Sequence, residues 1–109
     1  MIDWTRVTDL RLEIGAEDFC DIVDIFLDEV EQTLGRLPGA PPDQLGPLLH
    51  FLKGSALNLG FCDFARLCQE GEAMMAGRAP GTPDLGRILS CYEASKQSFL
   101  GTLADRFAA

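Results

Sequence analysis

The chain has 109 residues, of which 47% are hydrophobic, and a formal net charge of −8. That length is typical of one domain with its own core, without disulfides or metals to support it. The charge argues against nucleic-acid binding, which needs a basic surface. No apolar run approaches the ~20 residues of a membrane span, and residues 1–6 lack the features of a secretion signal. We therefore expect residues 1–109 to form one cytoplasmic domain, with neither nucleic acid nor membrane as a partner.

Cysteine and histidine usage bears on metal binding and on disulfides. The chain has four cysteines, none in a Cys-x-x-Cys pair, and a single histidine. This set of residues does not suit a zinc site, and without a secretion signal the thiols should be reduced. We expect no metal site and no bound cofactor.

Apolar residues at three- and four-residue steps predict helices along the whole chain, and no segment alternates like a strand. A first helix over residues 3–14 ends at Gly15, since glycine accepts the left-handed conformation that ends helices. A second helix over residues 16–37 ends in the proline-rich segment 38–42. Its apolar stripe comprises Phe19, Ile22, Val23, Phe26, Val30, Leu34 and Leu37.

The third helix covers residues 43–60, and its start is ambiguous. Pro42 can be its first residue, but Pro47 then lies inside the helix and costs roughly 3 kcal/mol or forces a kink. Alternatively, Gly46 caps the helix and Pro47 is its first residue. The sequence does not decide between these starts.

Two further helices are predicted, over residues 63–76 and from about residue 83 to 107. Thr82 is the expected cap of the last helix, with Pro83 at its first position and Asp84 in its first turn. Its stripe comprises Leu85, Ile88, Leu89, Tyr92, Phe99, Leu103 and Phe107. The predicted fold is all-α: helices two to five form an up-down four-helix bundle, and the short N-terminal helix caps one end.

The third helix places the only histidine, His50, away from its predicted core face. The same outer face carries Gly46, Pro47, Lys53, Gly54 and Leu57, and also Phe61 if the helix reaches that far. A solvated face should be rich in charge, whereas this one is partly apolar. We therefore predict a partner-docking surface around His50 formed by Pro47, Phe51, Leu57 and Phe61.

A lone exposed histidine can act as a nucleophile that forms a covalent intermediate. The sequence shows neither a recognisable catalytic triad nor a phosphate-binding loop around His50. Lys53, one turn away, would offset charge on phosphoryl oxygens, and Gly54 would let an incoming active site approach closely. Each feature is commonplace alone; their combination favours attack on phosphorus.

The segment from His50 to Gly60 resembles the motif of histidine-containing phosphotransfer (HPt) domains, which is His-x-x-Lys-Gly, small residues, then an apolar-Gly pair. The matching residues are His50, Lys53, Gly54, Ser55, Leu59 and Gly60. The resemblance extends more loosely to residues 14–19 and 67–70. Gly46, Pro47 and Gly71 depart from the helix-forming residues expected at their positions.

This resemblance implies a carrier in multistep two-component signalling. His50 would accept a phosphoryl group through Nε2 from the aspartyl phosphate of a receiver domain and pass it reversibly to another receiver. Glu72 matches a family position that contacts the other ring nitrogen; a carboxylate there would leave Nε2 as the nucleophile. Mg²⁺ would come from the receiver domain. The implied partners are response-regulator receivers and a hybrid histidine kinase, and the chain would be a monomer without autokinase activity.

Three rival interpretations remain. A module with this fold could bind and sequester a kinase or receiver without transfer, although the combination of His50, Lys53 and Gly54 argues against that. A metal-carboxylate bundle would need Glu-x-x-His pairs on two helices, which one histidine cannot supply. A bundle with an incidental histidine does not explain the apolar outer face. The sequence does not identify the donor, the acceptor, the stimulus or the direction of phosphoryl flow.

Overall fold

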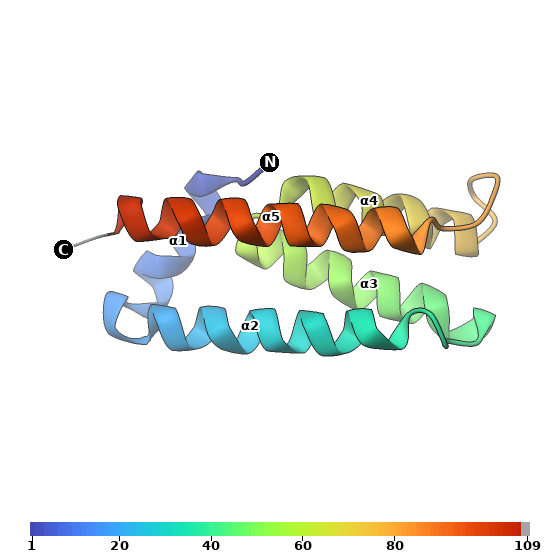
Figure 1. The fold of residues 1–109 in the computed structure, drawn as a ribbon, viewed down its shortest axis with the longest axis horizontal. Helices are drawn as coiled ribbons and strands as arrows, with labels where there is room; N and C mark the ends of the chain where they lie inside the picture. The colour runs from blue at the N-terminus through green and yellow to red at the C-terminus, as the bar shows by residue number, and fades with distance from the viewer. Residues whose placement is uncertain (108–109) are drawn as a thin grey trace.

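The computed structural model describes residues 1–107, which form five α-helices. The helices are α1 (Trp4–Ile14), α2 (Ala16–Arg36), α3 (Pro42–Leu59), α4 (Cys62–Met75) and α5 (Leu85–Arg106). Helices α2 to α5 run alternately up and down along the long axis of the molecule, and α1 lies across one end (Figure 1), in a body of 46 × 21 × 20 Å. The predicted all-α bundle with a short N-terminal helix is confirmed. Within residues 1–107, none of the helices combines the length and the apolarity needed to cross a lipid bilayer.

The start of α3 follows the first of the two alternatives. Pro42 is at its N-terminal turn and Pro47 lies inside the helix. Since proline has no backbone N–H, the carbonyl of Asp43 lacks its usual donor four residues later. The first turn is instead supported by Gln44 and Leu45, whose N–H groups both donate to the carbonyl of Pro41.

The prediction that Thr82 caps the last helix is wrong. Asp84 is the cap, and its Oδ1 accepts a hydrogen bond of 3.0 Å from the backbone N–H of Arg87. Pro83 therefore precedes the helix. The physical reason is that aspartate is itself a strong N-cap residue, and here it satisfies one of the free donors of the first turn.

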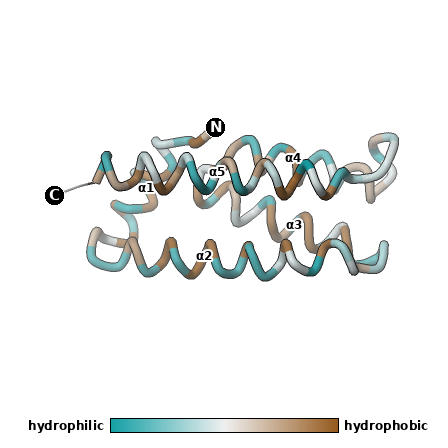
Figure 2. The backbone as a smooth tube through the Cα atoms, in the orientation of Figure 1, coloured by the Kyte–Doolittle hydropathy of each residue, from teal (hydrophilic) through white to brown (hydrophobic). Residues whose placement is uncertain are grey.

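The buried side chains form one continuous core with contributions from all five helices. In α2 the buried stripe runs through Phe19, Val23, Leu27, Val30 and Leu34, so Leu27 belongs to it, while Ile22 and Phe26 lie at its edge, half-buried. Leu89, expected in the stripe of α5, is 48% exposed, because the face of α5 that turns inward is centred on its neighbours Ile88 and Tyr92. In Figure 2, hydrophobic and hydrophilic residues alternate along α2, as expected of a helix with one buried face.

Helix α1 joins the end of α3 to α5, as the predicted capping helix should. The backbone N–H of Asp3 donates to the carbonyl of Gly60 at 2.7 Å, and Arg6 Nε donates to the carbonyl of Asn58 at 3.3 Å. On the other side, the Trp4 ring stacks on Phe99 of α5, with centroids 5.7 Å apart. Helix α1 thereby connects the C-terminal end of α3 to α5.

Candidate functional site

Helices α3 and α4 form the largest contact between any two helices in the structure, and this pairing builds the site. The buried face of α3 consists of Leu49, Leu52, Ser55, Ala56 and Leu59. His50 follows Leu49 and therefore points away from the core, about 100° further round the helix. Its side chain is 67% exposed, as the sequence predicted for the only histidine.

Glu72 of α4 holds one nitrogen of the His50 ring. The distance between His50 Nδ1 and Glu72 Oε2 is 2.6 Å. An ionised carboxylate only accepts hydrogen bonds, so we assign the proton of the neutral imidazole to Nδ1. No residue among 1–107 hydrogen-bonds Nε2, which keeps its lone pair on an exposed side chain. The contact between Glu72 and Nδ1 that the family register suggested is present.

The second oxygen of Glu72 binds Lys53. Lys53 Nζ donates to Glu72 Oε1 at 2.7 Å, and the two side chains are only 24% and 19% exposed. The hydrogen bond from Lys53 is the largest cause that lowers the pKa of Glu72; the bond to His50 acts in the same direction, and burial opposes both. Glu72 is therefore ionised at neutral pH and links two residues of α3 that lie one turn apart.

The outer face of α3 around His50 is open. Pro47 is exposed, and Phe51 and Leu57 are 42% and 56% exposed. A Cβ atom added at Gly54 would meet nothing within 4 Å. The protein's own packing therefore does not require glycine at position 54, and the free space lies one turn beyond His50.

Phe61 does not belong to this surface, so its predicted place in the partner-docking surface is wrong. Its side chain is 1% exposed and packs in the core, with its ring centroid 5.2 Å from that of Phe99. The reason is the end of α3 at Gly60, which has a left-handed φ of +76°. The N–H groups of Gly60 and Phe61 donate to the carbonyls of Leu57 and Ala56, a Schellman arrangement that turns the chain inward.

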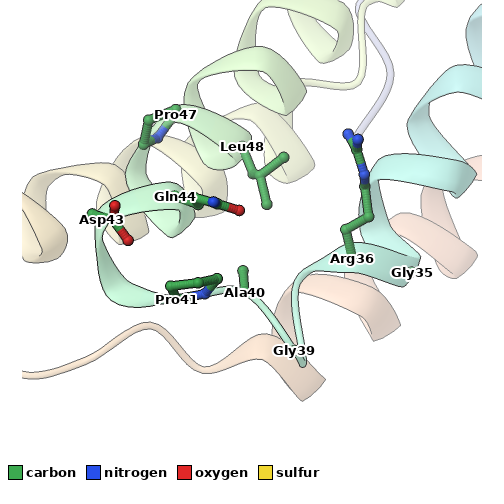
Figure 3. Close-up of a pocket in the computed structure, with 9 residues that line it drawn as sticks. All are labelled: Gly35, Arg36, Gly39, Ala40, Pro41, Asp43, Gln44, Pro47 and Leu48. Atoms are coloured by element: carbon green, nitrogen blue, oxygen red, sulfur yellow. The ribbon is translucent and has the colours of Figure 1, made fainter.

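Two grooves flank the outer face of α3, and each has an arginine in its wall. The groove beside His50 and Glu72 has a volume of about 560 Å³ and includes Arg78. The groove on the other side of Pro47, of about 550 Å³, lies between α3 and the end of α2 (Figure 3). There Gln44 and Leu48 of α3 face Arg36 of α2.

Sequence reasoning did not identify Arg36 or Arg78. They lie outside the motif, Arg36 at the end of α2 and Arg78 in the turn after α4, and only the packing of these segments against α3 brings them alongside. The sequence carries no local signal that would have assigned them to the site.

Comparison with protein families identifies residues 21–107 as an Hpt domain. No curated protein and no solved structure matches the chain significantly. The family match includes all of α3 and α4, and therefore His50, Lys53, Gly54 and Glu72. The chain belongs to the Hpt domain family, whose members carry phosphoryl groups on histidine in the phosphorelays of two-component signalling and interact there with receiver domains and histidine kinases.

Proposed function

We propose that this chain is a phosphorelay carrier in which His50 accepts a phosphoryl group from a receiver-domain aspartyl phosphate and passes it reversibly to another receiver. The observation that carries the proposal is the 2.6 Å hydrogen bond between His50 Nδ1 and Glu72, which leaves Nε2 as a free nucleophile. We expect this domain to act as a monomer and without kinase activity of its own.

In the proposed transfer, the Nε2 lone pair attacks phosphorus, an N–P bond forms, and the P–O bond to the aspartyl carboxylate breaks. The aspartate leaves as a carboxylate, and Nδ1 keeps its proton on the side of Glu72. Glu72 is thus a positioning residue: its hydrogen bond fixes the tautomer and the orientation of the ring. The reverse attack by a second receiver's aspartate regenerates the free lone pair. We expect no cofactor in this chain, with Mg²⁺ supplied by the receiver.

Lys53 is suited to offset the charge of the phosphoryl group. Before transfer, the opposite charges of Lys53 and Glu72 balance. A phosphoryl group on Nε2 places up to about two negative charges on its oxygens next to this pair, and the ring that keeps its Nδ1 proton carries one positive charge. The ammonium group of Lys53, on a flexible stem one turn from His50, provides a compensating cation, and Gly54 leaves room for the receiver's active site.

The experiment that tests the proposal is phosphoryl transfer from a phosphorylated receiver domain in the presence of Mg²⁺. Acid-labile, base-stable label should appear on the wild-type chain and be absent from His50→Gln. Arg66→Gln is a matched control, because Arg66 is an exposed residue of α4 outside both grooves. If folded protein takes label from none of the active receivers tested, the proposal fails. Stoichiometric binding to a kinase would then identify a sequestering module instead.

We expect the receiver to dock on the exposed apolar residues beside His50. Leu57→Asp should weaken receiver binding by about tenfold or more, because it places a charge in an interface centre that must lose its water. Leu12→Asp is the control, since Leu12 is 74% exposed on α1. Receiver affinity would be measured by calorimetry. If Leu57→Asp changes it no more than Leu12→Asp does, Leu57 is not part of the docking surface.

A further inference from the structure

A tight contact between α3 and α4 lies immediately beside the hydrogen bond that holds His50. Gly71 precedes Glu72 on α4, and Leu49 precedes His50 on α3. A Cβ atom added at Gly71 would lie 3.1 Å from Leu49 Cδ1, closer than such atoms normally approach. Gly71 is buried and Leu49 is 0% exposed, so this contact lies inside the packed bundle.

The added Cβ atom would also meet the turn that precedes α5. The same Cβ atom would lie 3.3 Å from Cβ of Pro83, in the turn that precedes α5. The proline ring has few ways to move aside, because its φ angle is fixed and Asp84 caps α5 directly after it. The space that a side chain at position 71 would need is therefore already taken by residues of α3 and of the turn before α5.

Glycine favours the helix less than alanine does, and a close contact of this kind is one reason for a helix to contain it. Other helical glycines of this chain lack one. An added Cβ atom would meet nothing within 4 Å at Gly101, and at Gly46, on the same α3–α4 contact, only Met75 Cβ at an ordinary 3.7 Å. Gly71 is distinguished by its contacts and by its place next to Glu72.

We propose that Gly71 is a positioning residue for His50: it lets α4 lie close enough to α3 for Glu72 to hold the ring with its proton on Nδ1. Consecutive residues on a helix are rigidly related, so the backbone separation at the pair 49/71 determines the separation at the pair 50/72. A side chain at position 71 forces α4 away from Leu49 and Pro83. Glu72 then loses its short contact with Nδ1 while the fold persists. Only the kinetic consequence rests on the proposed function.

The test uses the fact that the chain has one histidine, so its imidazole nitrogen signals are unambiguous. We would record ¹⁵N chemical shifts of the ring at about pH 8.5, above the range in which an ordinary imidazole titrates. The wild type should show the Nδ1–H tautomer. Gly71→Ala should shift the ring toward the tautomer mixture of a free imidazole, and Gly71→Val further. Gly101→Ala is the matched control and should leave the tautomer unchanged.

A rescue variant separates positioning from a general loss of structure. Leu49→Val removes the Cδ1 atom that the new Cβ meets, so Leu49→Val with Gly71→Ala should recover the Nδ1–H signature. Phosphoryl acceptance by Gly71→Ala should fall about tenfold and recover in the same double variant. A folded Gly71→Ala protein with the wild-type tautomer overturns the proposal. The nitrogen shifts decide this point even if the wild type accepts no phosphoryl group, so failure here is distinguishable from failure of the proposed function.

Discussion

Two glutamates in this bundle each bind a lysine and a ring on a neighbouring helix, yet only one of the two clusters exposes its ring. Glu72 of α4 contacts His50 and Lys53 of α3. Glu31 of α2 accepts hydrogen bonds from Tyr92 and Lys96 of α5, at 2.7 and 2.6 Å. In both cases a hydrogen bond from the lysine is the largest cause that lowers the pKa of the carboxylate.

The rings differ in exposure and in what remains free on them. Tyr92 is 0% exposed, and its only polar atom is used by Glu31; burial, then the hydrogen bond to Glu31, raises the pKa of its hydroxyl. The His50 side chain is 67% exposed and uses one of two nitrogens. The carboxylate–lysine pair is therefore common to both clusters and does not distinguish them. It satisfies a buried ring in one cluster, and in the proposed function it orients an exposed ring in the other.

The largest expected difference between the clusters concerns phosphoryl transfer. Glu72→Ala should slow acceptance by His50 about tenfold, because the ring loses the group that fixes its tautomer and orientation. Glu31→Ala should leave the rate unchanged. The measurement is the initial rate of labelling from a phosphorylated receiver, alongside the imidazole nitrogen shifts. If Glu72→Ala changes neither, Glu72 has no role in orienting His50.

Stability should show the opposite ranking. Glu31→Ala leaves the buried hydroxyl of Tyr92 without its partner and should lower the free energy of unfolding by about 1–3 kcal/mol. Adding Tyr92→Phe should restore part of that loss, because the unpaired hydroxyl is then removed as well. Urea unfolding of the two variants measures both effects. A double variant no more stable than Glu31→Ala would show that the hydroxyl was not the source of the loss.

The smallest effect is on acid stability. Because folding lowers the pKa of Glu31 and Glu72, both stabilise the folded state at neutral pH, and this contribution is lost as the pH falls from the ordinary glutamate range through the lowered values. Glu72→Gln should reduce the loss of stability between pH 6 and acid by less than about 1 kcal/mol. Unfolding curves at several pH values test this. A greater acid sensitivity in the variant would contradict the direction of the pKa shift.

Periodicity was enough to predict the elements and the orientation of His50. Apolar residues at helical steps indicate which side of α3 is buried, and His50 does not fall on that side. The prediction that Glu72 contacts His50 rested on the resemblance to the family and not on residue spacing, and the structure confirms that contact. The identification of the HPt family is likewise confirmed by the match over residues 21–107.

The predictions that were wrong, and the contacts that were not predicted, depend on how the helices end and on how they pack against one another. Phe61 was misplaced because one left-handed residue, Gly60, takes it out of the helical register. The burial of Leu27 and the exposure of Leu89 follow from which neighbour each helix meets, and adjacent apolar residues do not reveal that in sequence. The partnership of Glu31 with Tyr92 joins residues 61 positions apart and leaves no local pattern.

The unequal support at the two ends of α3 has a consequence for how that helix opens. Its C-terminal end is tied to α1 by the hydrogen bond from Asp3 to Gly60, whereas Pro47 deprives the carbonyl of Asp43 of a backbone donor near the other end. Local unfolding should therefore start at Pro42 and reach His50 before it reaches Leu59. Amide hydrogen exchange along α3 would then slow toward its C-terminal end, and the turn that carries His50 would lie between the end that unfolds first and the end that α1 holds in place.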